Sequence, residues 1–283
     1  MRPTSPAHWV WRPGMIAALI AAAISTTAPA GPPVQASIPN ARPALYVVND
    51  EDTVIYLFGT FHALDGKSEW FNDEVRTAFT GSDELVLETL VPSFLLKKPP
   101  VRNPAPGFGL QPVGPFAGSA SFLTTSKTVM QAGRSQGMST DQGADAILRE
   151  AAEEVGKPVG GLESFEFQLG MFARMPGAKP PSDPQAAART KAAVAAMLEQ
   201  LQSAWNRGDI ESFTPMLEQM QARSPETYRL LFNDRNGRWA QWIARRLQQP
   251  GVVFVAVGAG HLAGKDSVQN KLSLYGIRTA RVN

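Results

Sequence analysis

The chain has 283 residues, of which 43% are hydrophobic and 18% charged, as in ordinary globular proteins, and this composition excludes a wholly disordered chain. It contains no cysteine, which excludes disulfides, thiolate nucleophiles and cysteine-ligated zinc or iron–sulfur sites. The three histidines are His8, His62 and His261, so histidine chemistry must depend on very few positions.

Residues 1–30 have the layout of a secretory signal peptide. Arg2 and Arg12 precede an apolar run at residues 15–24, and Ala28-Pro-Ala30 supplies the small residues of a cleavage site. We therefore expect a periplasmic or secreted protein, with an N-terminally anchored protein as the alternative. The run is shorter than the ~20 residues that span a bilayer, so we expect no stable membrane span after cleavage.

Cleavage after Ala30 would leave 25 Lys and Arg residues against 25 Asp and Glu residues. A formally neutral chain has no basic footprint for nucleic acid, so we expect no nucleic-acid partner. Residues 31–43 are rich in Pro, Ala and Ser, which predicts a linker. Residues 44–283 then form a single predicted domain.

The first half of this domain predicts short strands and helices. β-branched runs at 45–48 and 54–58, separated by four polar residues, predict a hairpin. The patterns further along the chain predict, in order, a helix at 71–79, a strand at 85–87, a helix at 145–155, a strand at 159–162 and a helix at 165–175. Residues 97–118 are crowded with Pro and Gly and predict an irregular excursion.

The second half predicts a long helical region at 185–248, interrupted near Gly208, Pro225 and Gly237. A strand at 252–257, a helix at 265–275 and a strand at 278–282 follow it. Strand–helix–strand units at both ends predict an α/β fold, with a mixed central sheet flanked by helices and a helical insertion between the two units.

A Gly-x-x-His motif occurs after a predicted strand in each of these units. Gly59-Thr-Phe-His62 follows the strand 54–58, and Gly258-Ala-Gly-His261 follows the strand 252–257. Glycine permits a positive φ and a close backbone approach, so the chain can turn sharply at such a strand end, and a positive φ at Gly260 is one possibility. Ligands of open α/β sheets collect at the carboxyl ends of the strands.

Two further predicted strands run into glutamates, since 85–87 precedes Glu88 and 159–162 precedes Glu163. We therefore expect two imidazoles and two carboxylates at one sheet edge. This set suits a divalent metal ion with an open position for water. It equally suits a metal-free acid–base pair, with His as the base and a Glu of raised pKa as the acid. Arg235-Asn236 could hold a substrate carbonyl or carboxylate, or could cap a helix.

Several of these segments resemble the TraB/GumN family, which includes the Tiki metalloproteases. The matching segments are Tyr56-Leu-Phe-Gly-Thr-Phe-His62, Leu87-Glu88, Gly143-Ala-Asp145, Lys157-Pro-Val-Gly-Gly-Leu-Glu163 with Gln168, Trp205 with Gly208-Asp209, Arg235-Asn236 and Val255-Ala-Val-Gly-Ala-Gly-His-Leu-Ala-Gly264. The resemblance implies a fold similar to the erythromycin esterase and ChaN-like group. It also implies a metal-dependent hydrolase site, with His62, His261 and Glu88 holding Mn, Co or Zn.

The expected function is that of an exported metal-dependent hydrolase that acts on peptide bonds; its substrate would be a peptide or a small molecule. Glu88 or Glu163 would be a ligand or the general base, and Arg235 and Asn236 would hold the substrate or its oxyanion. Two alternatives use the same residues: a non-catalytic periplasmic protein that binds haem or a metal, and a metal-free, esterase-like hydrolase.

Overall fold

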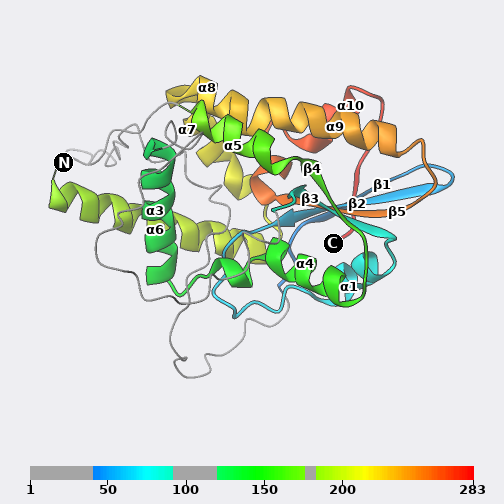
Figure 1. Ribbon diagram of the computed structural model, residues 1–283, viewed down its shortest axis with the longest axis horizontal. Helices are drawn as coiled ribbons and strands as arrows, with labels where there is room; N and C mark the ends of the chain where they lie inside the picture. The colour runs from blue at the N-terminus through cyan, green and yellow to red at the C-terminus, as the bar shows by residue number, and fades with distance from the viewer. Residues whose placement is uncertain (1–40, 92–119, 176–182) are drawn as a thin grey trace, which may run out of the picture.

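The computed structural model describes residues 41–91, 120–175 and 183–283 (Figure 1). The elements in chain order are β1 (Leu45–Asn49), β2 (Thr53–Thr60), α1 (Asp73–Thr80), β3 (Glu84–Thr89), α3 (Ala120–Ser135), η2 (Thr140–Gln142), α4 (Ala144–Glu154), β4 (Val159–Glu163), α5 (Phe165–Ala173), α6 (Pro184–Asn206), η3 (Glu211–Phe213), α7 (Thr214–Arg223), α8 (Pro225–Tyr228), η4 (Arg229–Asn233), α9 (Asp234–Arg246), β5 (Gly251–Gly258), η5 (Ala259–Leu262), α10 (Val268–Ser273) and β6 (Ala280–Arg281).

The strands form one mixed sheet in the order β4-β3-β5-β2-β1-β6. The four strands β4, β3, β5 and β2 are parallel to one another, and β1 is antiparallel to both β2 and β6. The predicted hairpin is β1–β2, and the Asp50 carboxylate closes its turn by accepting from the backbone N–H groups of Asp52 and Thr53. The predicted mixed α/β fold is confirmed.

Helices cover both faces of the sheet: α1 and α4 lie on one side and α5 and α9 on the other (Figure 1). Burial on both faces explains the continuous apolar runs of the parallel strands. On the α1 side, the Phe254 ring of β5 contacts Phe58 of β2 and Phe79 of α1, with centroid distances of 5.7 Å in both cases. The sheet therefore joins residues from both ends of the chain in one core.

Three helical predictions differ from the structure. The predicted break at Gly237 is wrong, because α9 runs through it and buries Trp239, Ala240 and Ile243 on one face. That packing outweighs the weak helix propensity of glycine. Helix α10 is shorter than the predicted 265–275, and α3 occupies a region for which we predicted no helix.

The predicted signal peptide at 1–30, most of the linker at 31–43 and the excursion at 97–118 lie outside the described residues. The last linker residues contact the domain: Ala41 is buried, and the backbone N–H of Arg42 donates to the carbonyl of Asn206 at 2.8 Å. No helix within the described ranges has the length and apolar character needed to cross a membrane.

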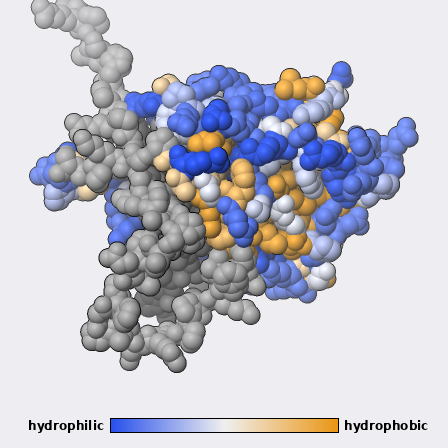
Figure 2. All heavy atoms as spheres, turned by 45° about the horizontal axis from the view of Figure 1, so that its top comes forward, coloured by the Kyte–Doolittle hydropathy of each residue, from blue (hydrophilic) through white to orange (hydrophobic). Residues whose placement is uncertain are grey.

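Most large hydrophobic side chains of the described residues are buried. Figure 2 shows one face of the molecule, where hydrophilic residues surround a smaller hydrophobic area. The exposed exceptions are Leu90, Val155, Phe167, Leu274, Tyr275 and Val282. A chain without cysteine thus depends on this core for its stability.

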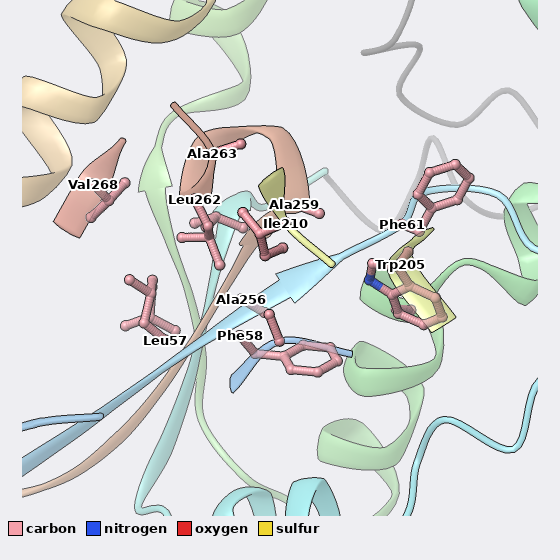
Figure 3. Close-up of a cluster of buried hydrophobic side chains, with 14 of the residues drawn as sticks. Leu57, Phe58, Phe61, Trp205, Ile210, Ala256, Ala259, Leu262, Ala263 and Val268 are labelled. Carbon is pink, nitrogen blue, oxygen red and sulfur yellow. The ribbon is translucent and has the colours of Figure 1, made fainter. Parts of the chain in front are cut away.

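Core packing anchors the two turns that carry the histidines (Figure 3). Phe61, directly before His62, lies 6.2 Å from the Trp205 ring, and the Trp205 indole N–H donates to the carbonyl of Gly59 at 2.7 Å. Leu262, directly after His261, is buried as well. Both histidines therefore extend from backbone that is fixed by buried neighbours.

Candidate functional site

The carboxyl ends of the four parallel strands bring the sequence-predicted site residues together. His62 follows β2, Glu88 lies near the end of β3, Glu163 ends β4, and His261 lies in η5 directly after β5. Helix α9 crosses this edge and contributes Arg235 and Asn236. Hydrogen bonds and ion pairs join five of these side chains in one buried network: Glu88, Glu163, Arg235, Asn236 and His261.

Arg235 is the centre of this network and is fully buried. Its Nε donates to Glu163 Oε2 at 2.9 Å, and its Nη2 donates to Glu88 Oε2 at 2.7 Å. Its Nη1 lies 3.3 Å from His261 Nε2 and 3.4 Å from the Leu231 carbonyl. All three guanidinium nitrogens thus have protein partners, and the group also stacks on Trp239 with Cζ 4.5 Å from the ring centroid.

A π-helical turn, η4, places the start of α9 at the site. The backbone N–H of Asp234 bonds to the carbonyl of Arg229, five residues earlier, instead of four as in an α-helix. Phe232 in this turn packs on His261, with ring centroids 4.8 Å apart. Such π-helical turns are rare in proteins as a whole, and those that occur are often located at functional sites.

His261 is held in one tautomer by Asn236. The Asn236 Nδ2 donates to the carbonyls of Asp266 (2.7 Å) and His261 (3.3 Å), which leaves Oδ1 as the acceptor for His261 Nδ1 at 2.5 Å. The Nε2 lone pair therefore faces Arg235 and Glu88, whose Oε1 is 3.6 Å away. Burial lowers the pKa of His261 to about 3, and the positive charge of Arg235 acts in the same direction. His261 is neutral at pH 7.

His62 is held by Asp145, which was not among the predicted site residues. Its Nδ1 lies 3.1 Å from Asp145 Oδ1, and both side chains are partly exposed. Burial lowers the pKa of His62, but the negative charge and the hydrogen bond of Asp145 outweigh it and raise the pKa to about 9. The Gly143-Ala-Asp145 segment was the sequence signal for this residue, but only the fold shows its partner.

Helix α4 carries Asp145 to His62 because its first turn docks on the histidine turn. The backbone N–H of Ala144 donates to the carbonyl of Phe61 at 2.9 Å. A Cβ at Gly143 would overlap the carbonyl of His62, so only glycine allows this approach. The position of Asp145 therefore depends on a close contact between two backbone segments.

Glu88 is an ionised carboxylate. Burial alone would raise its pKa, but Arg235, the two site histidines and the Gly258 N–H, which donates to Oε1 at 2.6 Å, hold the pKa far below its usual range. Glu88 therefore cannot be the acid of raised pKa that the metal-free interpretation requires, and that expectation is wrong for this residue. Glu163 uses both oxygens as acceptors, from Arg235 and from Arg238 at 3.1 Å.

Gly258 leaves open the space between these groups. Its φ of −54° is ordinary, but an added Cβ would lie 3.0 Å from Glu88 Oε1, 3.3 Å from His62 Nε2 and 3.7 Å from His261 Cδ2. Gly260 does not have the positive φ that was one possibility for it. Glycine is needed there because a Cβ would approach the Phe232 ring to 3.2 Å.

The expected divalent metal site would take its donor atoms from the side chains around Gly258. In both histidines Nδ1 is engaged, so Nε2 is the atom that a metal could bind, and at His261 this nitrogen would have to give up its contact of 3.3 Å with Arg235 Nη1. Metal-binding histidines usually have such a second partner on their other nitrogen. In the part of the chain that the structure describes, no three His, Asp or Glu side chains already form a group that could hold a metal ion. Binding would therefore require these side chains to draw closer together around the ion.

A comparison with protein-family models matches the model described as the TraB/PrgY/gumN family to residues 44–99 and 106–281. The chain belongs to the TraB/PrgY/gumN family. The match includes His62, Glu88, Glu163, Arg235-Asn236 and His261, and it confirms the resemblance that the sequence motifs indicated. Searches of curated proteins and of solved structures found no match.

Proposed function

We propose that this member of the TraB/PrgY/gumN family is an exported metal-dependent hydrolase that cleaves peptide bonds. The observation that carries the proposal is the matched arrangement of the two histidines. Each comes from a Gly-x-x-His turn at the end of a parallel strand, and each has Nδ1 bound to a partner so that Nε2 is the nitrogen left to bind an ion. The signal-like segment at 1–30 supports export.

His62, His261 and Glu88 would hold the ion, with Mn, Co or Zn as the candidates. A bound divalent ion supplies a Lewis acid that polarises a carbonyl and makes a water molecule more acidic. His62 carries a proton below about pH 9, so ion binding must displace this proton. Metal affinity should therefore increase with pH up to about 9.

The contacts of Arg235 and Asn236 favour roles different from the expected direct contact with substrate. The polar side-chain atoms of both are engaged with protein atoms. We propose that Arg235 fixes the Glu88 carboxylate and balances its charge, while Asn236 fixes the tautomer of His261. Glu163 would then be a positioning residue for Arg235, and not a general base.

Metal analysis of the purified chain tests the proposal. We expect the protein to retain Mn, Co or Zn, to lose peptidase activity with a chelator, and to regain it when the ion is restored. Glu88→Gln, His62→Ala and His261→Ala should each abolish tight metal binding. Glu84→Gln is the matched control, since Glu84 lies on the same strand but pairs with Arg246 at 3.0 Å. Unchanged metal content in both histidine variants would contradict the proposal.

A metal-free hydrolase is the second candidate. It is favoured by the ion pair at 2.7 Å between Arg235 and Glu88, which already balances the charge of the carboxylate, and by the lack of a preformed metal-binding group among the described side chains. Activity that survives complete removal of metal would support it. Uptake of haem by a metal-free, inactive protein, seen as a Soret band, would instead support the binding-protein alternative.

A further inference from the structure

Two buried hydroxyl groups at the strand ends have no hydrogen-bond partner. Thr60, the last residue of β2, is 2% exposed, and its Oγ1 bonds to no other atom of the described chain. Thr89 is the last residue of β3, and its Oγ1 is likewise buried and unpartnered. A buried hydroxyl without a partner is costly, so two of them at one sheet edge need an explanation.

The sheet register places Thr60 beside Gly258, and Thr89 ends the strand on the other side of β5. Thr60 is paired directly with Gly258 across β2 and β5. On the other side of β5, the pairing with β3 ends at Leu87 and Ala256, two residues before Thr89 and Gly258. Residues two apart on a strand point to the same face. Thr60 thus lies on the strand beside Gly258, and Thr89 ends the neighbouring strand at the same edge of the sheet.

A carboxylate oxygen and an imidazole nitrogen border the place where Gly258 lacks a Cβ. Glu88 Oε1 and His62 Nε2 lie 3.0 Å and 3.3 Å from the position that a Gly258 Cβ would occupy. Arg235, whose Nη2 lies 2.7 Å from Glu88 Oε2, balances the negative charge of Glu88. The carboxylate therefore does not repel an electron-rich atom that enters this place. An oxygen atom that entered would meet two hydroxyl groups whose protons are not committed elsewhere.

We propose that the Thr60 and Thr89 hydroxyls donate hydrogen bonds to the carbonyl oxygen of the substrate, bound in front of Gly258. The inference rests on the proposed hydrolase function, because it assigns the reacting group of the substrate to a place in that site. Negative charge grows on this oxygen when the carbonyl carbon becomes tetrahedral, so both hydrogen bonds would strengthen in the transition state.

The test measures binding of a dialanine analogue in which a phosphinate group replaces the scissile amide, by calorimetry on the full chain as purified. Thr60→Val keeps the shape but removes the donor, so it should weaken binding roughly tenfold. Thr60→Ser restores the hydroxyl and should stay close to the wild-type affinity. Thr89→Val should behave like Thr60→Val.

Thr53→Val is the matched control. Thr53 begins the same strand, and its Oγ1 lies 2.9 Å from the Gln249 carbonyl and 3.2 Å from the Leu247 carbonyl. Its variant should lower Tm and leave binding unchanged, whereas Thr60→Val should leave Tm unchanged or raise it, because it removes an unpartnered polar atom.

The inference is overturned if Thr60→Val binds the phosphinate as the wild type does, or if the wild type does not bind it. It is also overturned if Thr60→Ser and Thr60→Val weaken binding equally. A failure of the proposed function alone would give a different result. The protein would then contain no metal and show no peptidase activity, but its phosphinate affinity would still depend on the Thr60 hydroxyl.

Discussion

Arg235 shows how much of the site depends on one buried cation. Its guanidinium is the shared partner of two buried carboxylates, Glu88 and Glu163. Arg235→Met would leave Glu88 without its cationic partner and Glu163 with Arg238 alone, and breaking a buried pair costs about 3–5 kcal/mol. We expect urea denaturation to show a loss of this size. The partly exposed pair Arg246–Glu84 is the control, and Arg246→Met should cost no more than about 1 kcal/mol. Equal losses in both variants would contradict the assignment.

A substitution at Gly258 tests whether the space beside this residue is used, without straining the backbone. Its φ suits any residue, so Gly258→Ala adds only a methyl group, close to Glu88 and His62. We expect metal binding to fall sharply in calorimetric titration while Tm changes little. Gly170→Ala, in α5 with nothing near its added Cβ, should bind metal normally and be slightly more stable. Normal metal binding by Gly258→Ala would show that this space is not used.

The ion pair between His62 and Asp145 makes stability depend on pH. The pKa of His62 is about 9 in the folded chain and 6.5 as its ordinary value. A raised histidine pKa stabilises the folded state fully below pH 6.5, and this stabilisation is lost as pH rises through about 9. The difference in unfolding free energy between the wild type and Asp145→Asn should shrink across this range, measured without metal. A constant difference would mean that the pair carries no charge interaction.

Helix α4 and the turn that carries His62 are two elements whose backbones approach each other closely at Gly143. An added Cβ there would overlap a backbone carbonyl, which cannot move away as a side chain can. We expect Gly143→Ala to cost about 1–3 kcal/mol and to move Asp145 away from His62. NMR of the His62 ring should then show loss of the protonated Nδ1 state at pH 8. A variant with normal stability but an altered His62 signal would contradict the steric explanation.

The elements that the sequence predicted well are those whose pattern is local. The parallel strands are apolar runs next to Gly-x-x-His or Glu, so their location and the shared edge of His62, His261, Glu88 and Glu163 follow from the pattern and from α/β topology. The contact of Asp145 with His62 depends on how α4 docks, and the state of the Thr60 hydroxyl depends on the pairing of β2 with β5. No local pattern contains such long-range information.

For the whole molecule, β5 is the strand that decides when the fold can form. It lies between β3 and β2, yet it starts at Gly251, after most of the chain. A chain synthesised only as far as α9 has two central strands whose shared neighbour is still missing. Contacts of such large sequence separation form slowly and late. The order of synthesis and the order of assembly are therefore opposed, so the growing chain stays open until β5 has been made. We expect a fragment ending at Gln248 to show no cooperative thermal transition and rapid proteolysis; a fragment that resists protease would show that folding does not wait for β5.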